Sequence, residues 1–485
     1  MTPRRPYALA AAALALSAAT TSPLMAQGVR GEISIRGSSL ELRPLVRDSL
    51  PESSVSGQGI RRVLPDGTRT TCTPDLFCQW FASSSPEMFS VVTQEIRATG
   101  WGFVPRLSTH VHLRGRYGSD EFWPLTNQEF EAVAAYVNWE HPTLRARGGR
   151  ITRTDGLGYY NFDGASVLWR GLAPMWVELY GGWSLARGLN APRTGNLLQQ
   201  ADDLPPDERG LIFGGQLGVK LSPRVSGTVM YQRQIRSDRL ALYSERASLD
   251  LHAAVGRASL GFSSEYDWAN DEFNEIKLRA STPLPGGFDV SATARHYSPF
   301  FELWTIWGAF SPTGFDEGLL SVGWSNTPAG IRLEAGGGYR DYEDTGITAS
   351  GLRENGWRAF TGFRWQGEGW FANGSYAADV GFGAARFGGD LSAGRTFGEG
   401  TFLSVRGSRT QTFGELRFNE QYVSGLGVDG ALTVGEATLT AGASVNRLDG
   451  RERPADADWT QTRVYAGLSM RFGTEPSVRH GSRGP

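Results

Sequence analysis

The stretch "TRVYAGLSMRFG" (residues 462–473), near the end of the chain, alternates between two kinds of side chain. In an extended strand successive side chains point to opposite faces, so this stretch has two rows. One row is apolar and consists of Val464, Ala466, Leu468, Met470 and Phe472. The other row is mostly polar and consists of Arg463, Tyr465, Gly467, Ser469 and Arg471. The strand therefore needs apolar surroundings on one side and a wet surface on the other.

The same alternation recurs from about Met88 onward, in stretches of about 10 to 14 residues separated by turns. Clear examples are "RVSGTVMYQRQIR" (224–236) and "ALTVGEATLTAGASVN" (431–446). Short connections such as "SPR", "VG", "LPG" and "GE" alternate strictly with longer ones, at 187–209, 297–316, 341–355 and 448–460. Short turns at one end and long loops at the other are typical of outer-membrane barrels, whose short turns are periplasmic and whose long loops are extracellular.

Two environments produce such alternation, namely a soluble sheet sandwich and a membrane-spanning barrel. Tryptophans near the ends of the expected strands favour the barrel, because they suit an interfacial girdle; they are Trp139, Trp169, Trp183, Trp268, Trp324, Trp357 and Trp370. Small residues in the apolar rows also favour it, because a packed interior would be left with voids; they are Ala253, Ala292, Ala335, Ala359 and Ala443. We therefore predict an all-β fold, a transmembrane antiparallel β-barrel.

Composition and the N-terminus agree with this fold class. The chain has 485 residues, with 63 glycines and 11% aromatic residues, a combination suited to many twisted strands with aromatic anchors. Arg4 and Arg5 precede an apolar run and the small residues before Gln27, which predicts a secretory signal peptide over residues 1–26. After it, no stretch approaches the roughly 20 apolar residues of a spanning helix, so we exclude a helical inner-membrane protein.

The expected strands number about 22, with 18 and 20 left open, and they begin at "RGEISIRGSSLELRPLV" (30–46). The barrel should cover residues 27–473, with an extracellular loop over 47–87 and a periplasmic tail over 474–485. The apolar stretch at 298–315 is expected either to form a constriction in the lumen or to pack across the barrel mouth. Large transporters with 22 strands carry an N-terminal plug domain, for which there is no room before residue 31.

The architecture, the leader and the last strand resemble Gram-negative outer-membrane porins over essentially the whole mature chain. A narrower resemblance lies in "RARGGRITRTDGLGYYNFDGA" (145–165), which is similar to a strand, turn and strand of alginate-export-type porins. It rests on Gly149, Arg150 and the sequence Phe-Asp-Gly at 162–164. The first resemblance implies an outer-membrane location. The second covers too few residues to imply which substrate is transported.

Cys72 and Cys78, in "CTPDLFC", are the only cysteines. In an exported protein such a pair predicts one small disulfide within the 47–87 loop. A metal site is the alternative, and it would need further ligands that the neighbouring sequence does not supply.

Side chains in the expected polar rows are the candidate lumen-lining residues. They are His110, His112, Arg114, Arg116, Lys220, Arg236, Asp250, His252, Glu265, Asp267, Lys277, Arg295, Arg332, Arg358, Arg364, Arg406, Arg463 and Arg471. Basic residues, Arg279 among them, outnumber carboxylates on these rows, which predicts a mild preference for anions. Lys277 is expected to pair with Glu265 or Asp289.

Two other chemistries are open to these residues, namely metal binding and acid–base catalysis. His110 and His112 are two apart and point the same way, which permits a metal site, but Arg114 and Arg116 on the same row would repel a cation. Asp250 and His252, opposite Glu265 and Asp267, are the best candidates for acid–base work in a barrel hydrolase. A wet lumen needs polar side chains in any case, so we expect neither a metal, a cofactor nor catalysis.

The predicted function is passive conduction of small hydrophilic solutes, with anions as the candidate preferred class. The alternative is a non-conducting barrel acting as adhesin, receptor or scaffold; a barrel hydrolase ranks below both. Expected partners are outer-membrane lipid and lipopolysaccharide, the barrel-assembly machinery and the solutes. The sequence has no basic patch interleaved with aromatics, so no nucleic-acid partner is expected.

Overall fold

The computed structural model describes residues 28–42, 45–57, 71–72, 77–83, 85–118, 130–185, 210–236, 242–298, 314–343, 355–381, 384–413, 421–450 and 459–473. The predicted signal peptide, the predicted tail over 474–485 and most of the 298–315 stretch lie outside these residues. No described helix is long and apolar enough to cross a membrane.

Most described residues lie in β-strands of one large sheet. Its strands in the first half of the chain are β1 (Gly28–Leu42), β5 (Glu87–Trp101), β6 (Leu107–Gly118), β7 (Phe130–Glu140), β8 (Leu144–Asp155), β9 (Gly158–Leu172), β10 (Met175–Ser184), β11 (Gly210–Ser222), β12 (Val225–Arg236), β13 (Leu242–Val255) and β14 (Ala258–Asp267). Its remaining strands are β15 (Glu272–Pro283), β16 (Phe288–Tyr297), β17 (Phe315–Asn326), β18 (Ile331–Tyr342), β19 (Asn355–Gly367), β20 (Trp370–Gly381), β21 (Ala384–Gly398), β22 (Thr401–Phe413), β23 (Gln421–Val434), β24 (Ala437–Gly450) and β25 (Trp459–Gly473). A one-turn 3-10 helix, η4 (Pro285–Gly287), joins β15 to β16.

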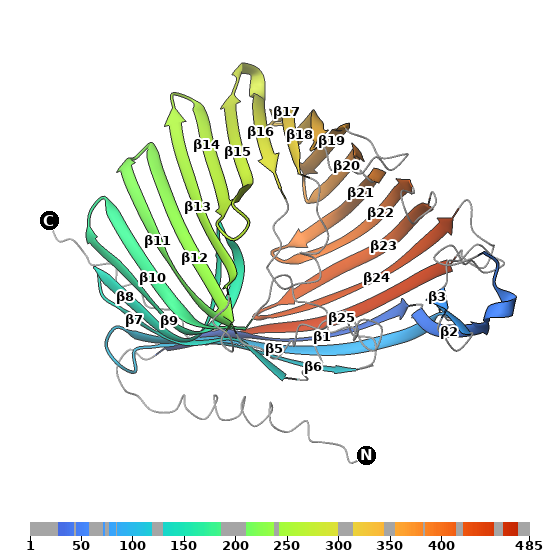
Figure 1. Ribbon diagram of the computed structural model, residues 1–485, viewed down its shortest axis with the longest axis horizontal. Coiled ribbons are helices and arrows are strands. Elements are labelled where there is room, and N and C mark those ends of the chain that lie inside the picture. Colours follow the sequence, from blue (N-terminus) through green and yellow to red (C-terminus); the bar gives the residue numbers. More distant parts are fainter. Residues whose placement is uncertain are drawn as a thin grey trace, which may run out of the picture.

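The sheet closes on itself into an antiparallel barrel of 22 strands, which confirms the predicted fold class and strand number. Each strand pairs with its neighbours along the sheet, and β1 pairs with both β5 and β25. At the closing seam Ile33 lies opposite Met470 and Ile35 opposite Leu468, so residues 462–473 belong to the strand that closes the barrel. Figure 1 shows the red strand β25 beside the blue strands β1 and β5.

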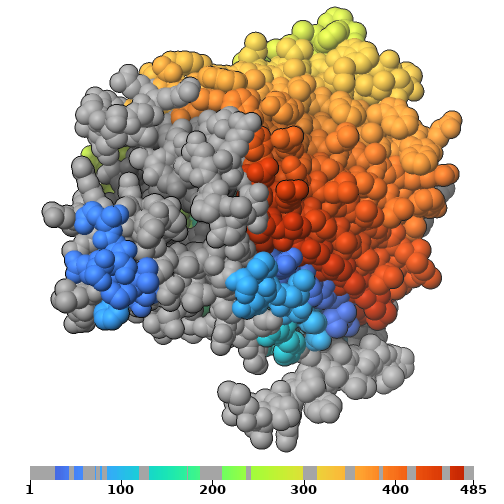
Figure 2. All heavy atoms as spheres, turned by 90° about the vertical axis from the view of Figure 1, so that its right-hand side faces the viewer, coloured from blue at the N-terminus to red at the C-terminus, as the bar shows by residue number. Residues whose placement is uncertain are grey.

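The two rows of each strand continue across the barrel, because residues opposite each other in neighbouring strands share a face. The apolar row of β25 continues through Ile33 and Ile35, and its large side chains are exposed; Leu468 is 47% exposed. Exposed large apolar residues recur on this face of the other strands, as at Leu251 and Leu278. This outer face forms a continuous wall, whose C-terminal part is coloured yellow to red in Figure 2.

The tryptophans of the predicted girdle lie at or near strand ends, as expected. Trp183 is the next-to-last residue of β10, and Trp370 is the first residue of β20. Both side chains are exposed, as are those of Trp169, Trp268 and Trp357. An outward apolar band flanked by aromatic residues is the arrangement that a bilayer requires of a barrel.

The connections fit the expected two-ended pattern, with one correction. One end of the barrel carries tight turns such as 223–224, 256–257 and 435–436. At the other end the connections are not all long, because β8 and β9 are joined through 156–157 alone and β14 and β15 through 268–271. The alternation in length is therefore not strict.

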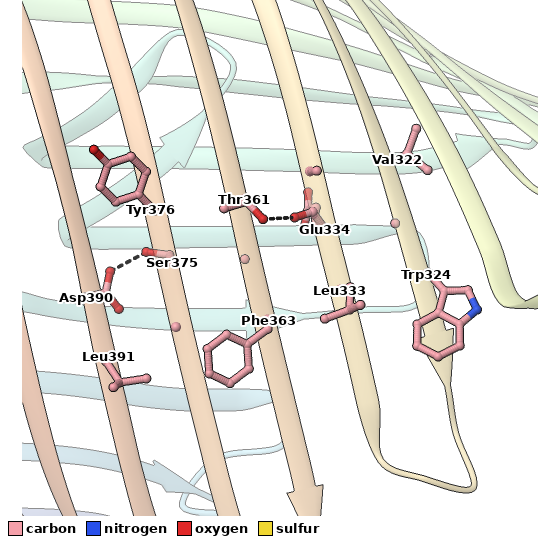
Figure 3. Close-up of a pocket in the computed structure, with 14 residues that line it drawn as sticks. Val322, Trp324, Leu333, Glu334, Thr361, Phe363, Ser375, Tyr376, Asp390 and Leu391 are labelled. Carbon is pink, nitrogen blue, oxygen red and sulfur yellow. Dashed lines mark hydrogen bonds between the residues drawn. The ribbon is translucent and has the colours of Figure 1, made fainter.

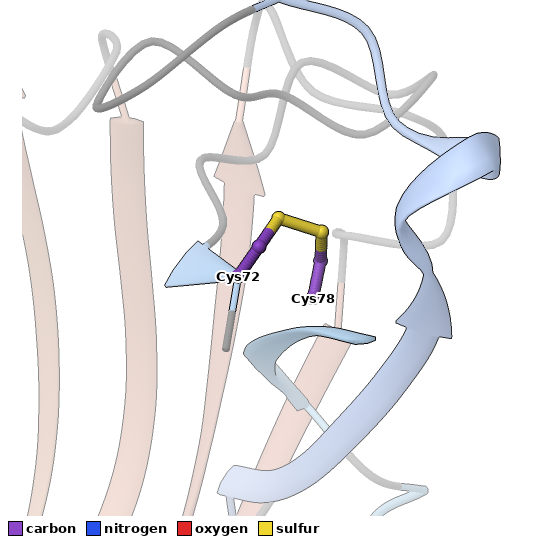
Figure 4. Close-up of a disulfide and its surroundings, with 2 residues drawn as sticks. All are labelled: Cys72 and Cys78. Carbon is purple, nitrogen blue, oxygen red and sulfur yellow. A yellow bond between two sulfur atoms is a disulfide. The ribbon is translucent and has the colours of Figure 1, made fainter. Parts of the chain in front are cut away.

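A small second sheet lies between β1 and β5 in the chain. It contains β2 (Leu45–Pro51), β4 (Phe77–Ser83) and β3 (Thr71–Cys72) in the order β2-β4-β3, and the 3-10 helix η1 (Glu52–Ser54) follows β2. Cys72 and Cys78 lie opposite each other in β3 and β4 and form the predicted disulfide, shown in Figure 4. Apart from Leu45 and Val46 at the start of β2, the sheet is built from residues of the predicted 47–87 loop, and it does not join the barrel.

Candidate functional site

The hairpin of β8 and β9 leaves the barrel wall and folds inward. Pairing between β7 and β8 stops at Ala135 opposite Arg150, directly after Gly149, whose φ of +129° favours glycine. The rest of the hairpin, residues 151–162 (the inner hairpin), lies against the inner face of the neighbouring strands, and at its end Phe162 still pairs with Ser184 of β10. At its tip, a methyl group added to Gly156 would lie 2.8 Å from Oδ2 of Asp250 in β13.

Side chains replace the backbone hydrogen bonds that β7 loses where the hairpin departs. Arg150 Nη1 donates to the carbonyl of Ala132 at 2.9 Å. Thr152 Oγ1 and Asn161 Nδ2 both donate to the carbonyl of Val133, at 3.2 and 3.1 Å. A backbone carbonyl that faces lipid without a hydrogen-bond donor is unfavourable by roughly several kcal/mol. These side-chain donors therefore satisfy the β7 carbonyls where the hairpin leaves the sheet.

An ion pair at the base of the hairpin fixes Arg150 in this role. Its Nε and Nη2 donate to the two carboxylate oxygens of Asp163 at 2.8 and 2.9 Å. A bidentate pair of this kind restricts the guanidinium group to one orientation. Arg150 and Asp163 belong to residues 145–165, which the structure shows as a strand, a turn and a strand.

An apolar cluster holds the inner hairpin against the wall. Phe162 and Ile151 are 0% and 1% exposed, and they pack with Leu157 and Tyr160 of the same hairpin. The wall contributes side chains from three consecutive strands, namely Tyr180, Ile212 and Met230. This cluster is the hydrophobic core of the described chain, and it lies inside the barrel.

Arg153 anchors the hairpin through polar contacts. Its Nη1 lies 3.1 Å from Glu178 Oε1 in β10, and its Nη2 donates to Gln216 Oε1 in β11 at 3.1 Å. The guanidinium carbon lies 4.3 Å from the centre of the Tyr180 ring. Within the hairpin, Asp155 accepts hydrogen bonds from the Tyr160 hydroxyl and the Leu157 amide. The hairpin is therefore fixed by both packing and charge.

The alternating rows did not predict this inner hairpin, although the sequence carries a signal for it. In most other strands the inner row is mostly polar and the outer row mostly apolar. Between 150 and 163 the polarity is inverted, because Ile151 and Phe162 lie on the inner row while Thr152 and Asn161 lie on the outer one. A polarity inversion limited to one hairpin indicates that the hairpin has left the lipid boundary.

The register places the predicted lumen residues on the inner face. They are His110, His112, Arg114 and Arg116 on β6, Lys220 on β11, Asp250 and His252 on β13, Glu265 and Asp267 on β14, Lys277 on β15, Arg295 on β16, Arg332 on β18, Arg358 and Arg364 on β19, Arg406 on β22, and Arg463 and Arg471 on β25. Arg236 lies in β12, and its side chain is outside the described part of the structure.

Many inner-face arginines are ion-paired. Glu317 lies 2.7 Å from Arg340 and 2.8 Å from Arg358, and Arg340 also contacts Asp379 at 2.9 Å. Further pairs join Arg295 to Glu275, Arg332 to Asp289 and Arg406 to Asp429. Several of them skip a strand, as side chains on a concave inner surface can.

Lys277 differs from expectation. Glu265 pairs with Arg246 at 2.8 Å, and Asp289 pairs with Arg332 at 3.1 Å. Within the described residues no carboxylate lies within 4.0 Å of Lys277. In the register, Lys277 lies between Ser263 and Arg295. The expected pairing is therefore wrong, because both carboxylates are paired with arginines, whose guanidinium groups offer more hydrogen-bond donors than an ammonium group.

His110 and His112 are held in a network of side chains on β5 and β6. His112 Nε2 lies 3.2 Å from Glu95 Oε2, and Arg114 Nε donates to Glu95 Oε1 at 2.7 Å. His110 Nδ1 lies 3.1 Å from Thr99 Oγ1, and its ring stacks on Tyr136 at 4.7 Å. Among the described residues no group of three or more His, Cys, Asp or Glu side chains has the arrangement of a metal site.

Asp250 and His252 share a row but have different partners. His252 Nε2 lies 3.1 Å from Ser259 Oγ of the adjacent strand, and Asp250 lies under the hairpin tip at Gly156. No described carboxylate hydrogen-bonds His252. The structure thus brings a serine to the histidine without the orienting acid of a nucleophilic triad.

The fold and the inner face define a barrel of the outer-membrane class. No family model and no curated protein matches the chain. Solved structures that are similar to it include OccK11 (OpdR) of Pseudomonas aeruginosa, at 12% identity and a TM-score of 0.40, covering 92% of this chain and 96% of that one. A BenF-like porin from Pseudomonas fluorescens matches at 10% identity and a TM-score of 0.38, covering 92% and 99%. The fold assignment rests on the strand register and the closure described above.

Proposed function

We propose that the protein is a channel of the outer membrane that conducts small hydrophilic solutes, preferentially anions, past the inner hairpin. The observation that carries the proposal is the surplus of free positive charge on the inner face. Inner-face cations without a described carboxylate within 4.0 Å are Arg30, Arg36, Arg147, Lys220, Lys277, Arg279, Arg364, Arg386, Arg463 and Arg471. Inner-face carboxylates without a described basic group within 4.0 Å are fewer, and they include Glu32, Asp250 and Glu334.

Free cations differ from paired ones in what they offer a passing solute. An ion-paired guanidinium group contributes little electric field in the lumen, because the carboxylate roughly 3 to 4 Å away cancels most of its charge. Lys277 and Arg279 are adjacent members of one inner row, and Arg295 with its partner Glu275 lies beside them. This part of the wall therefore presents net positive charge to the lumen, and such charge raises the local concentration of anions.

Reversal potentials under a KCl gradient should show a modest anion preference for the refolded channel. The preference is modest because physiological salt screens charges beyond about 8 Å. The double variant Lys277→Glu/Arg279→Glu should shift the reversal potential toward cation preference. Arg395→Gln serves as the matched control, because Arg395 lies on the outer row opposite Trp370 and should leave selectivity unchanged. Clear cation selectivity of the unmodified channel would contradict the proposal.

A second candidate is a non-conducting barrel whose extramembrane parts bind a partner. It is favoured by the disulfide-bonded sheet β2-β4-β3, which is separate from the barrel and lies near the ends of β1 and β5 (Figure 1). A folded barrel that passes no ion current in planar bilayers would favour this candidate.

We predict that the tight-turn end of the barrel is periplasmic. Ala269 and Arg257 lie at the two ends of β14, in turns 268–271 and 256–257. On intact cells a membrane-impermeant maleimide should label Ala269→Cys and leave Arg257→Cys unlabelled, whereas lysed cells should label both. Labelling of Arg257→Cys alone on intact cells would invert the topology.

A further inference from the structure

Two exposed arginines lie on one rung of the outer face, where a rung is a row of residues that lie opposite one another in successive strands. Across β22, β23 and β24, Arg409 lies opposite Ser424, and Ser424 lies opposite Arg447. Both arginines and the serine are exposed. The rung below is apolar, with Gly407, Leu426 and Val445 in the corresponding positions. The arginines therefore mark the upper boundary of the apolar band on this side of the barrel.

Among the residues that the structure describes, no carboxylate neutralises either arginine. Arg409 lies over the ring of Tyr422 at 5.0 Å, and no described carboxylate lies within 4.0 Å of Arg409 or Arg447. Asp449 is on the same face one rung higher and makes no ion pair with them. Two strand spacings separate the two arginines, about 10 Å, so both guanidinium groups can reach one anionic group above Ser424.

An apolar groove begins on the same rung. The rung continues from Arg409 through Gly389 to Tyr376 and Thr361, both of which line a groove of about 500 Å³. Figure 3 shows Tyr376, Leu391, Phe363 and Trp324 around this groove. Its lining includes Gly374 on the outer row of β20, which lacks a side chain that would fill it.

The rung descends into the band as it runs toward the groove. Arg447 lies three residues before the end of β24 at Gly450, and Arg409 lies four before Phe413. Tyr376 lies five before Gly381, the end of β20. A molecule with an anionic head at the arginines would therefore have its tail directed deeper, into the groove.

We propose that Arg409, Ser424 and Arg447 bind a phosphate of an acylated glycolipid in the outer leaflet, and that the groove takes one of its acyl chains. We choose a phosphate as the anionic group because the planar guanidinium group of arginine can donate two parallel hydrogen bonds to phosphate oxygens. We choose the outer leaflet because these residues lie at the end of the barrel opposite the tight turns, which we predict to be periplasmic. The proposal rests on the outer-membrane location and topology proposed above, and it does not depend on conduction.

Native mass spectrometry of the refolded, full-length protein in detergent tests the proposal with purified bisphosphorylated lipid A as the probe. The unmodified protein should retain it, and Arg409→Gln/Arg447→Gln should bind it at least tenfold more weakly, roughly what loss of one or two charge-assisted hydrogen bonds implies. Arg395→Gln is the matched control, because Arg395 is also an arginine on the outer row but lies near the tight-turn end of β21. It should bind the probe as the unmodified protein does.

Three further measurements make the result decisive. Enzymatically dephosphorylated lipid A should bind the unmodified protein as weakly as the intact probe binds the double variant, which tests the phosphate even if that variant folds poorly. Equal binding of phosphatidylglycerol and lipid A would overturn the choice of a glycolipid. Unaltered binding by the folded double variant would overturn the site. Conductance of the same preparations, measured in bilayers free of glycolipid, separates a failure of this site from a failure of the channel proposal.

Discussion

Replacing the inner hairpin, residues 151–162, with a two-residue Asn-Gly turn should raise single-channel conductance by roughly twofold or more, because a barrel of 22 strands is wide where nothing fills it. The design keeps Arg150 opposite Asp163, so the bidentate pair still closes the shortened hairpin. The cluster of Ile151, Leu157, Tyr160 and Phe162 leaves the lumen with the hairpin. Planar-bilayer recordings of refolded protein measure the change.

The control for this experiment is a second turn at the same end of the barrel. The connection at 268–271 joins β14 to β15 and contributes nothing to the inner apolar cluster. Replacing it with Asn-Gly should leave conductance unchanged. If removing the inner hairpin left conductance unaltered while the barrel remained folded, the narrowest part of the path would lie elsewhere.

Leu251→Arg should weaken barrel folding by about 2 to 4 kcal/mol, the range for a basic residue placed on the lipid face near the bilayer midplane. Leu251 is 46% exposed on the outer row of β13 and lies opposite Phe262. A guanidinium group there would replace an apolar contact with lipid. Urea titration in lipid vesicles, followed by heat-modifiable mobility on gels, measures the loss.

The neighbouring inner-row residue provides the control. His252→Arg changes the adjacent position, whose side chain lies opposite Gly261 and faces the lumen, so stability should stay within about 1 kcal/mol. Asp250 is less suitable, because its carboxylate lies against the hairpin tip at Gly156. Equal damage from the two arginine substitutions would mean that the assigned faces of β13 are wrong.

The barrel was predictable because lipid contact imposes a simple rule on every strand. Leu251 and His252, or Leu468 and Ser469, are neighbours in sequence and lie on opposite faces, as their polarity indicates. The closing pair of strands was predictable in the same way, since an even set of antiparallel strands leaves only β1 for β25 to join. The disulfide followed from spacing and export.

The site was less predictable, because its features depend on contacts between strands. Nothing local to Lys277 reveals that Arg246 and Arg332 take the carboxylates expected for it. The inward fold of 151–162 depends on Tyr180, Ile212 and Met230, which come from three later strands. The inverted polarity around Ile151 and Phe162 was present in the sequence, but it identifies an inner hairpin only once the rest of the barrel is known.

The seam between β1 and β25 has a consequence for how the barrel is made. The backbone amide of Thr462 donates to the Glu41 carboxylate, a bond between residues 421 positions apart in the chain. Contacts so distant in sequence form slowly, although each doubling of a loop adds only about 0.6 kcal/mol of closure entropy. Synthesis must therefore reach β25 before the wall can close, and a chain truncated before Trp459 would expose the edges of β1 and β24 to lipid.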